Sequence, residues 1–154
     1  MDSLMIFGAS DLIYVIFFIC LLLLIFGGVK EKKAFLIILI GLLIAKISIQ
    51  IIHLIFLEPR PYITFNLVPL IKHIPDAAFP SQHTTLVSVV AFAYFFCKSK
   101  FTLLFVLTGL WVGFARIYVG VHYPLDILGG ILVGALSVSL VLFFKKLLHL
   151  WAHR

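Results

Sequence analysis

Long apolar runs, separated by short polar segments, constrain this chain more than any other feature of its sequence. A helix that crosses a membrane needs about 20 consecutive apolar residues. Five runs approach that length, at about 11–28, 34–57, 81–97, 101–119 and 124–144. Only 12% of the 154 residues are charged, whereas about 25% is usual in a soluble domain. We therefore expect an all-α, polytopic membrane bundle of five, or six, transmembrane helices that forms one domain over residues 1–154.

The lysines and arginines indicate how such a bundle is oriented. Cytoplasmic loops of membrane proteins carry an excess of these residues. If the predicted loop 29–33 is cytoplasmic, its side of the membrane holds eight of them: Lys30, Lys32, Lys33, Lys98, Lys100, Lys145, Lys146 and Arg154. The opposite side holds three: Arg60, Lys72 and Arg116. We expect the N-terminus outside and the C-terminus in the cytoplasm. No A-x-A cleavage site follows the first run, which we expect to stay as an anchor.

The net charge of +6 does not indicate a nucleic-acid partner. A protein that binds nucleic acid clusters its basic residues on a polar face, but here they lie in short segments between apolar runs. The expected partners are the lipid bilayer and a membrane lipid, and the sequence identifies no protein partner.

Polar residues gather at the predicted outer ends of the second to fifth runs: Arg60, His83, Arg116, His122 and Asp126. Structural polar residues would be distributed over both ends. A lone arginine at a helix end often contacts only lipid headgroups, but Pro59 and Pro61 restrict the backbone on both sides of Arg60. Two guanidinium groups near one point indicate an anion site, since their geometry suits phosphate oxygens.

The stretch "FPSQH" (79–83) predicts the start of a helix. Proline is favoured at early helical positions and serine at the N-cap, so Ser81 is the expected cap. A helix N-terminus offers free backbone N–H groups and the positive end of the dipole to an anion. Alternatively, Ser81 is only a cap and His83, in the first turn, is an ordinary interfacial polar residue.

His122 and Asp126 are four residues apart, with Pro124 between them. On a helical turn they share a face, so the carboxylate accepts a hydrogen bond from one ring nitrogen. The other nitrogen is then free to act as a base or nucleophile. Alternatively, Asp126 only complements the helix dipole. Taken together, the paired arginines and histidines and this aspartate favour phosphoryl transfer.

Three stretches, "EPRP", "FPSQH" and "ARIYVGVHYPLD", resemble the signature motifs K-x6-RP, PSGH and SR-x5-H-x3-D of the type 2 phosphatidic acid phosphatase (PAP2) superfamily. The resemblance spans about residues 53–126. Members are multi-helix enzymes that remove phosphate from membrane lipids without a metal, so it implies neither a metal nor another cofactor. It further implies that His122 is the nucleophile and forms a phosphohistidine, that Asp126 orients it, and that His83 is the acid. The residues implied to bind the phosphoryl oxygens are Arg60, Ser81 and Arg116.

The chain departs from these motifs at three positions. His53 stands where the family has lysine, Gln82 where it has glycine, and Ala115 where it has serine. We expect His53 and Gln82 to contribute to phosphate binding, and Ala115 to remove one hydroxyl contact. Lys46 lies about 10 Å further along the same helix, too far to replace the lysine directly.

The segment "RPYITFNLVPLIKHIPDAAFPSQHTT" resembles the bacitracin-resistance type of undecaprenyl-diphosphatase, in which "PDASFPSDH" is common. The implied reaction is hydrolysis of a polyprenyl diphosphate to the monophosphate and phosphate, at the outer face during cell-wall assembly. One alternative is a phosphatidate or phosphatidylglycerophosphate phosphatase. Another is a non-enzymatic lipid-binding protein or small transporter, since Lys46, Gln50 and His53 form a polar stripe inside one run. In the last run, Gly130 and Gly134 predict close helix packing within the molecule.

Overall fold

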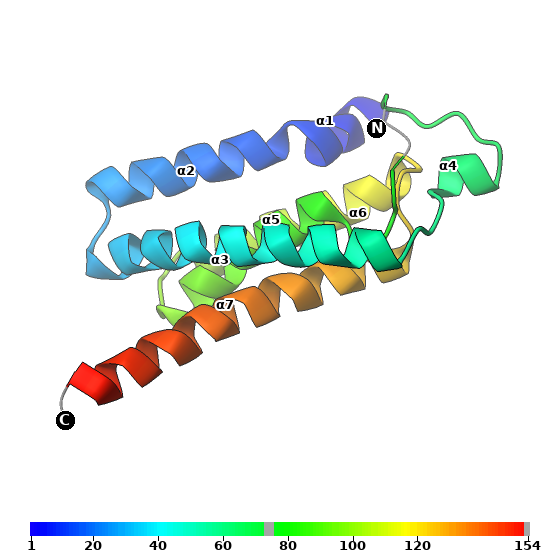
Figure 1. The fold of residues 1–154 in the computed structure, drawn as a ribbon. Helices are drawn as coiled ribbons and strands as arrows, with labels where there is room; N and C mark the ends of the chain where they lie inside the picture. Colours follow the sequence, from blue (N-terminus) through cyan, green and yellow to red (C-terminus); the bar gives the residue numbers. More distant parts are fainter. Residues whose placement is uncertain (73–75, 153–154) are drawn as a thin grey trace.

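The computed structural model describes the backbone of residues 1–72 and 76–152 and side chains as far as residue 147. All regular elements in this part of the chain are helices (Figure 1): α1 (Asp2–Ser10), α2 (Leu12–Phe26), α3 (Val29–Ile55), α4 (Pro61–Thr64), α5 (Gln82–Phe96), α6 (Thr102–Tyr118) and α7 (Pro124–Ala152). The long helices run side by side, and the short α4 lies beyond the end of α3.

The expected apolar segments are present. By length and composition, α3 with 27 residues and α7 over residues 124–147 are each able to cross a membrane. The helices α1 and α2 meet at a bend of 53° and together qualify as a third span. The helices α5 and α6 are apolar but shorter, with 15 and 17 residues. Each predicted run therefore corresponds to one helix or, in the first case, to a bent pair, which confirms a membrane helix bundle.

Two predicted boundaries are wrong. The first run begins at Asp2 and bends at Asp11, and residues 29–33 form the start of α3 instead of a loop. The carboxylate of Glu31 accepts a hydrogen bond from the Gly28 backbone N–H at 3.0 Å, and this cap begins α3 before its lysines, which are good helix formers. The connection from α2 is therefore only Gly27 and Gly28.

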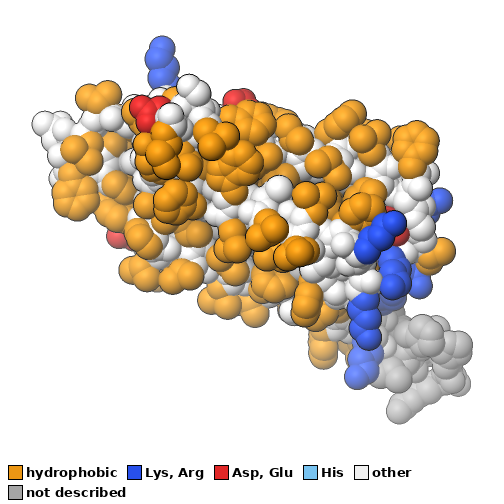
Figure 2. All heavy atoms as spheres, turned by 180° about the vertical axis from the view of Figure 1, so that it is seen from behind, with side chains coloured by type: hydrophobic (Ala, Val, Ile, Leu, Met, Phe, Trp, Pro, Cys, Tyr) orange, Lys and Arg blue, Asp and Glu red, His pale blue; other side chains and the backbone are white. Residues whose placement is uncertain are grey.

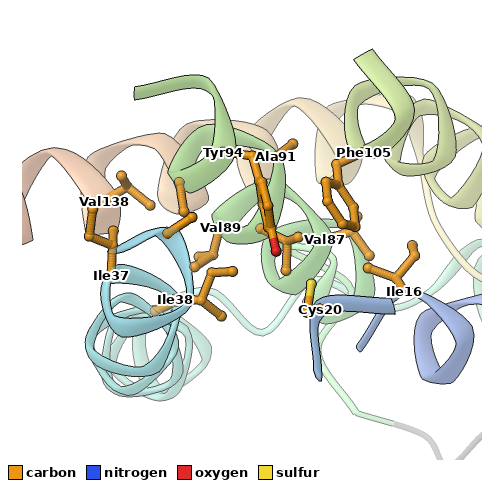
Figure 3. Close-up of a cluster of buried hydrophobic side chains, with 14 of the residues drawn as sticks. Ile16, Cys20, Ile37, Ile38, Val87, Val89, Ala91, Tyr94, Phe105 and Val138 are labelled. Atoms are coloured by element: carbon orange, nitrogen blue, oxygen red, sulfur yellow. The ribbon is translucent and has the colours of Figure 1, made fainter. Parts of the chain in front are cut away.

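The helix α5 lies at the centre of the bundle. Figure 3 shows its side chains among residues of the surrounding helices α2, α3, α6 and α7: Val87, Val89, Ala91 and Tyr94 of α5 face Ile16, Cys20, Ile37, Ile38, Phe105 and Val138. The rings of Tyr94 and Phe105 have centroids 4.3 Å apart. This packing sets the position of the N-terminus of α5 relative to the end of α6 and the start of α7.

Two glycines let α7 approach α5 closely. A Cβ atom at Gly134 would lie 2.6 Å from Cβ of Ser88, and one at Gly130 would lie 2.9 Å from the carbonyl oxygen of Ser81. Such distances leave no room for a side chain. The predicted packing of the G-x-x-x-G pair within the molecule is confirmed, and it brings Ser81 beside the first turns of α7.

The two ends of the bundle differ in charge. The Lys30 ammonium donates a hydrogen bond to the carbonyl oxygen of Lys98 at 2.9 Å, which joins the start of α3 to the α5–α6 turn. Figure 2 shows Lys and Arg side chains gathered at this end, while apolar side chains cover most of the visible face. The opposite end holds α4 and the turn between α6 and α7 (Figure 1). Arg154 lies outside the described residues.

Candidate active site

His122 lies in the turn between α6 and α7 and is 3% exposed. Its Nδ1 is 3.1 Å from Oδ2 of Asp126. Its Nε2 is 3.0 Å from Nη1 of Arg60 and 3.4 Å from Nη2 of Arg116. An ionised carboxylate can only accept a hydrogen bond, so Nδ1, which faces Asp126, carries the proton. A guanidinium can only donate, so Nε2, which faces the arginines, carries the lone pair.

The contact between His122 and Asp126 forms differently from the expectation. The helix α7 begins at Pro124, so His122 precedes the helix and the two residues share no helical face. Instead, the Asp126 carboxylate reaches back toward the start of the helix, where Oδ2 also accepts a hydrogen bond from the Tyr123 backbone N–H at 2.8 Å. This is the acidic half of a capping box. The same side chain therefore caps α7 and fixes the imidazole ring.

Arg60 is held rigidly at the start of α4. It is the N-cap residue, in extended conformation, and Pro61 is the first residue of the helix. Its Nε and Nη2 lie 2.8 and 2.7 Å from Oδ1 of Asp76. Its Nη1 donates to the carbonyl oxygen of Val121 at 2.9 Å, and the side chain is 2% exposed. These contacts aim Nη1 at His122.

Arg116 occupies the last turn of α6 and is also 2% exposed. Its Nη1 donates to the carbonyl oxygen of Ala9 at 3.1 Å, so α1 helps to position the side chain. Ala115, which stands at the family's serine position, packs against α1: a Cβ atom at Gly8 would lie 3.0 Å from Cβ of Ala115. The small residue at 115 thus suits the close approach of α1.

Ser81 caps α5, as expected. Its Oγ accepts hydrogen bonds from the backbone N–H of Thr84 at 3.4 Å and from the Thr84 hydroxyl at 3.1 Å. Its own backbone N–H donates to the carbonyl oxygen of Asp126 at 3.0 Å. The N-terminus of α5, with the partly buried His83 in its first turn, is therefore tied to the segment that carries the His122–Asp126 pair.

His53 and Gln82 line a groove between α3 and α5, together with Lys46 and Gln50. Among the residues that the structure describes, Nε2 of His53 is buried and has no hydrogen-bond partner. The structure thus brings Arg60, Arg116, His122 and Asp126 into direct contact and joins Ser81 to them through its backbone. It places His53 and Gln82 in an adjoining groove.

The surroundings of His122 favour its neutral form. Burial lowers the pKa of His122 below its ordinary value of 6.5, and the hydrogen bond to Asp126 opposes this only in part. The positive charges of the two guanidinium groups lower the pKa further. The neutral ring keeps its proton on Nδ1 and a free electron pair on Nε2.

Asp76 belongs to the site but was not among the predicted residues. The signal that identifies it is a carboxylate in "IPDAAFP", close to an arginine that is buried and requires a counter-charge. The carbonyl groups of Ala9 and Val121 gave no such signal, because backbone acceptors are the same at every residue.

Comparison with known proteins agrees with this geometry. The family model described as the PAP2 superfamily matches residues 34–148. Undecaprenyl-diphosphatase BcrC of Bacillus subtilis is 35% identical over 148 residues, which cover 96% of this chain and 77% of the relative. Bacitracin transport permease protein BcrC of Bacillus licheniformis is 33% identical over 132 residues, covering 83% and 65%.

Among solved structures, the crystal structure of Aquifex aeolicus LpxE matches with a TM-score of 0.73 and 24% identity, covering 91% of this chain and 81% of LpxE. This likeness concerns the fold. Together with the family match over most of the chain and the contacts among the three motifs, it leads to one assignment: this chain belongs to the PAP2 superfamily.

Proposed function

We propose that the protein is a membrane phosphatase that hydrolyses a polyprenyl diphosphate to the monophosphate and inorganic phosphate. The observation that carries this proposal is the position of Nε2 of His122, whose lone pair faces two buried guanidinium groups while Asp126 holds the opposite nitrogen. This arrangement pairs a nucleophile with donors for phosphoryl oxygens. The similarity to an undecaprenyl-diphosphatase over 96% of the chain supports a polyprenyl diphosphate as the substrate.

In the first step, Nε2 of His122 attacks the terminal phosphorus atom. The bond from this phosphorus to the bridging oxygen breaks, and its electron pair stays on that oxygen, which becomes part of the polyprenyl phosphate. His83 protonates the leaving oxygen. Before substrate binds, the guanidinium N–H groups of Arg60 and Arg116 donate to Nε2. They now donate to the phosphoryl oxygens instead, because these are stronger, charged acceptors. The Ser81 hydroxyl donates to a further phosphoryl oxygen.

In the second step, water hydrolyses the phosphohistidine. His83 now accepts a proton from the water, whose oxygen attacks the phosphorus as the phosphorus–nitrogen bond breaks. Inorganic phosphate leaves and His122 returns to the neutral tautomer, which the hydrogen bond to Asp126 selects. The positive charge that the ring carries as the phosphohistidine is stabilised by the Asp126 carboxylate.

We also propose that this chemistry takes place at the extracytoplasmic face, with the N-terminus outside and the C-terminus in the cytoplasm. Support comes from the position of most lysines, which lie far from the His122 cluster. The end that carries Lys30 and Lys98 lies opposite the end that carries α4 and the α6–α7 turn. An excess of lysine is typical of the cytoplasmic side.

The proposal is tested by phosphate release from undecaprenyl diphosphate by purified wild-type protein and the His122→Ala variant. Phosphatidate and phosphatidylglycerophosphate serve as competing substrates. Loss of the nucleophile is expected to lower kcat by about a thousandfold or more, and acid-labile phosphate should be trapped on the wild-type protein alone. Full activity in His122→Ala contradicts the mechanism, and faster hydrolysis of a phospholipid contradicts the substrate.

The name of the Bacillus licheniformis relative indicates a transport permease, and the same variant distinguishes this activity from catalysis. Transport of bacitracin does not require a neutral imidazole between a carboxylate and two arginines. A protein that protects cells against bacitracin equally well with alanine at position 122 acts as a transporter, whereas loss of protection together with phosphate release supports the phosphatase.

A further inference from the structure

A groove of about 420 Å³ between α3 and α5 has a composition unusual for the membrane interior. Its α3 wall carries Lys46, Gln50 and His53, at spacings of four and three residues that align them on one helical stripe. Charged and strongly polar side chains are costly at this depth and mark functional sites. The described residues that complete the groove are apolar, except Gln82.

One atom in the groove lacks a partner. Nε2 of His53 is buried, and no hydrogen-bonding group among the described residues reaches it. A buried polar atom without a partner is destabilising, so it is expected to be retained where a ligand supplies the missing partner. An oxygen-rich anion is such a ligand for a stripe that offers an ammonium group, an amide and an imidazole.

The groove adjoins the candidate active site. Gln82, at its outer end, directly follows Ser81, whose backbone N–H is bonded to the carbonyl oxygen of Asp126. From there the groove follows α3 down to Leu42 and Leu43, toward the middle of the bundle.

We propose that this groove is a second phosphate subsite, which binds the phosphate that stays on the polyprenyl chain, with Lys46 as the cation that selects diphosphate over monophosphate substrates. The inference rests on the function proposed above and extends it. When the terminal phosphoryl group moves to His122, the bridging oxygen takes the electron pair and the proton from His83, and it becomes a hydroxyl of the remaining, still anionic phosphate. Lys46 and Gln50 bind this product phosphate, and His53 donates to it from Nε2. The prenyl chain continues along Leu42, Leu43 and Leu86.

The test compares two substrates that share one prenyl chain, farnesyl diphosphate and farnesyl phosphate. The quantity measured is the ratio of their kcat/KM values. In Lys46→Met this ratio is expected to fall about tenfold, because a charge-assisted contact to the retained phosphate is lost. Lys46→Arg keeps the charge and should retain most of the preference. The matched control is Lys32→Met, which removes an exposed lysine from the same helix outside the groove and should leave the ratio unchanged.

Each outcome decides between the subsite and its alternatives. A Lys46→Met protein that melts like wild type but keeps the wild-type ratio overturns the subsite, as does a wild-type enzyme without preference for the diphosphate. An equal fall of both kcat/KM values assigns Lys46 a structural role and overturns it too. If wild-type protein hydrolyses neither substrate, the proposed function itself is wrong. The subsite and the phosphatase activity therefore fail in distinguishable ways.

Discussion

At the scale of single residues, each nitrogen of the His122 ring has its own task. Nδ1 donates to the Asp126 carboxylate, which selects the tautomer, and Nε2 accepts from the guanidinium groups of Arg60 and Arg116. The ring is buried, so these contacts are not exchanged for water. In the proposed mechanism, a phosphoryl group that takes the arginine donors frees the lone pair at the moment when the phosphorus atom is in reach. Anion binding and activation of the nucleophile are thereby one event.

Asp76 positions Arg60, so the loss of its charge should weaken anion binding and the activation of His122. In Asp76→Asn the charge that faces Nε and Nη2 of Arg60 is lost. Since the Asp76 side chain is 39% exposed, we expect only about 1 kcal/mol of lost stability. We expect kcat/KM to fall about tenfold as Arg60 loses its orientation, and the inhibition constant for vanadate to rise by a similar factor. Steady-state kinetics and a melting curve in detergent measure these effects.

The control for this variant is Glu58→Gln, which removes an exposed carboxylate two residues before Arg60. It should change neither vanadate inhibition nor kcat/KM. Asp76→Glu, which keeps the charge, should recover part of the activity. If Asp76→Asn lowers the melting temperature but leaves vanadate inhibition unchanged, Asp76 supports the loop and does not position Arg60.

At the scale of helices, the close contact of α5 with α7 holds the site together. A methyl group at Gly134 would lie 2.6 Å from Cβ of Ser88 and 3.0 Å from the backbone oxygen of Thr85. Gly134→Ala should therefore push the helices apart and lower stability by about 1–3 kcal/mol. Gly109→Ala is the matched control, because its new Cβ would be 3.6 Å from the nearest atom, on Val87, and alanine favours the helix. Chemical denaturation in mixed micelles measures both, and equal stability losses would argue against a tight α5–α7 contact.

The helices show which features of the fold a single sequence predicts. Apolar runs identify the helical segments because burial in lipid requires them. The start of α3 differs from the prediction because residues 29–33 are mostly charged, and such a segment between apolar runs predicts a loop. At α3 the decisive residue is Glu31, whose side chain caps the Gly28 backbone N–H. Such a cap is a local feature that a window over apolar residues does not detect.

In the candidate site, too, the sequence predicts some contacts and not others. Contacts within one short segment are predicted from spacing: the Ser81 cap forms as expected, and His122 contacts Asp126, although through the cap of α7 and not on a shared helical face. The ion pair of Arg60 with Asp76 crosses a loop, and the hydrogen bond from Arg116 to Ala9 joins residues 107 positions apart. Both depend on the path of the chain in space, which no spacing rule contains.

At the scale of the whole molecule, the candidate active site and most of the lysines lie at opposite ends of the long axis of the bundle. One end collects α4, the N-terminus of α5, the α6–α7 turn and the carbonyl oxygen of Ala9 from α1 around His122. The other end carries most of the lysines (Figure 2). A bilayer suits the faces between, where large apolar side chains are exposed on every long helix, including Leu43, Leu110 and Leu132. In the proposed orientation, the substrate reaches the site from the outer leaflet.

This orientation is measurable with single cysteines in a Cys20→Ala, Cys97→Ala background. Val68→Cys introduces a thiol at a 93% exposed position in the loop after α4, and Lys100→Cys introduces one at the opposite end. Because the excess of lysine favours the cytoplasm, a membrane-impermeant maleimide should label Val68→Cys in intact cells. The extent of labelling of Lys100→Cys should be low in intact cells and rise at least about tenfold when the cells are permeabilised. The opposite pattern would put His122 in the cytoplasm, where a carrier diphosphate released at the outer face cannot reach it without first crossing the membrane.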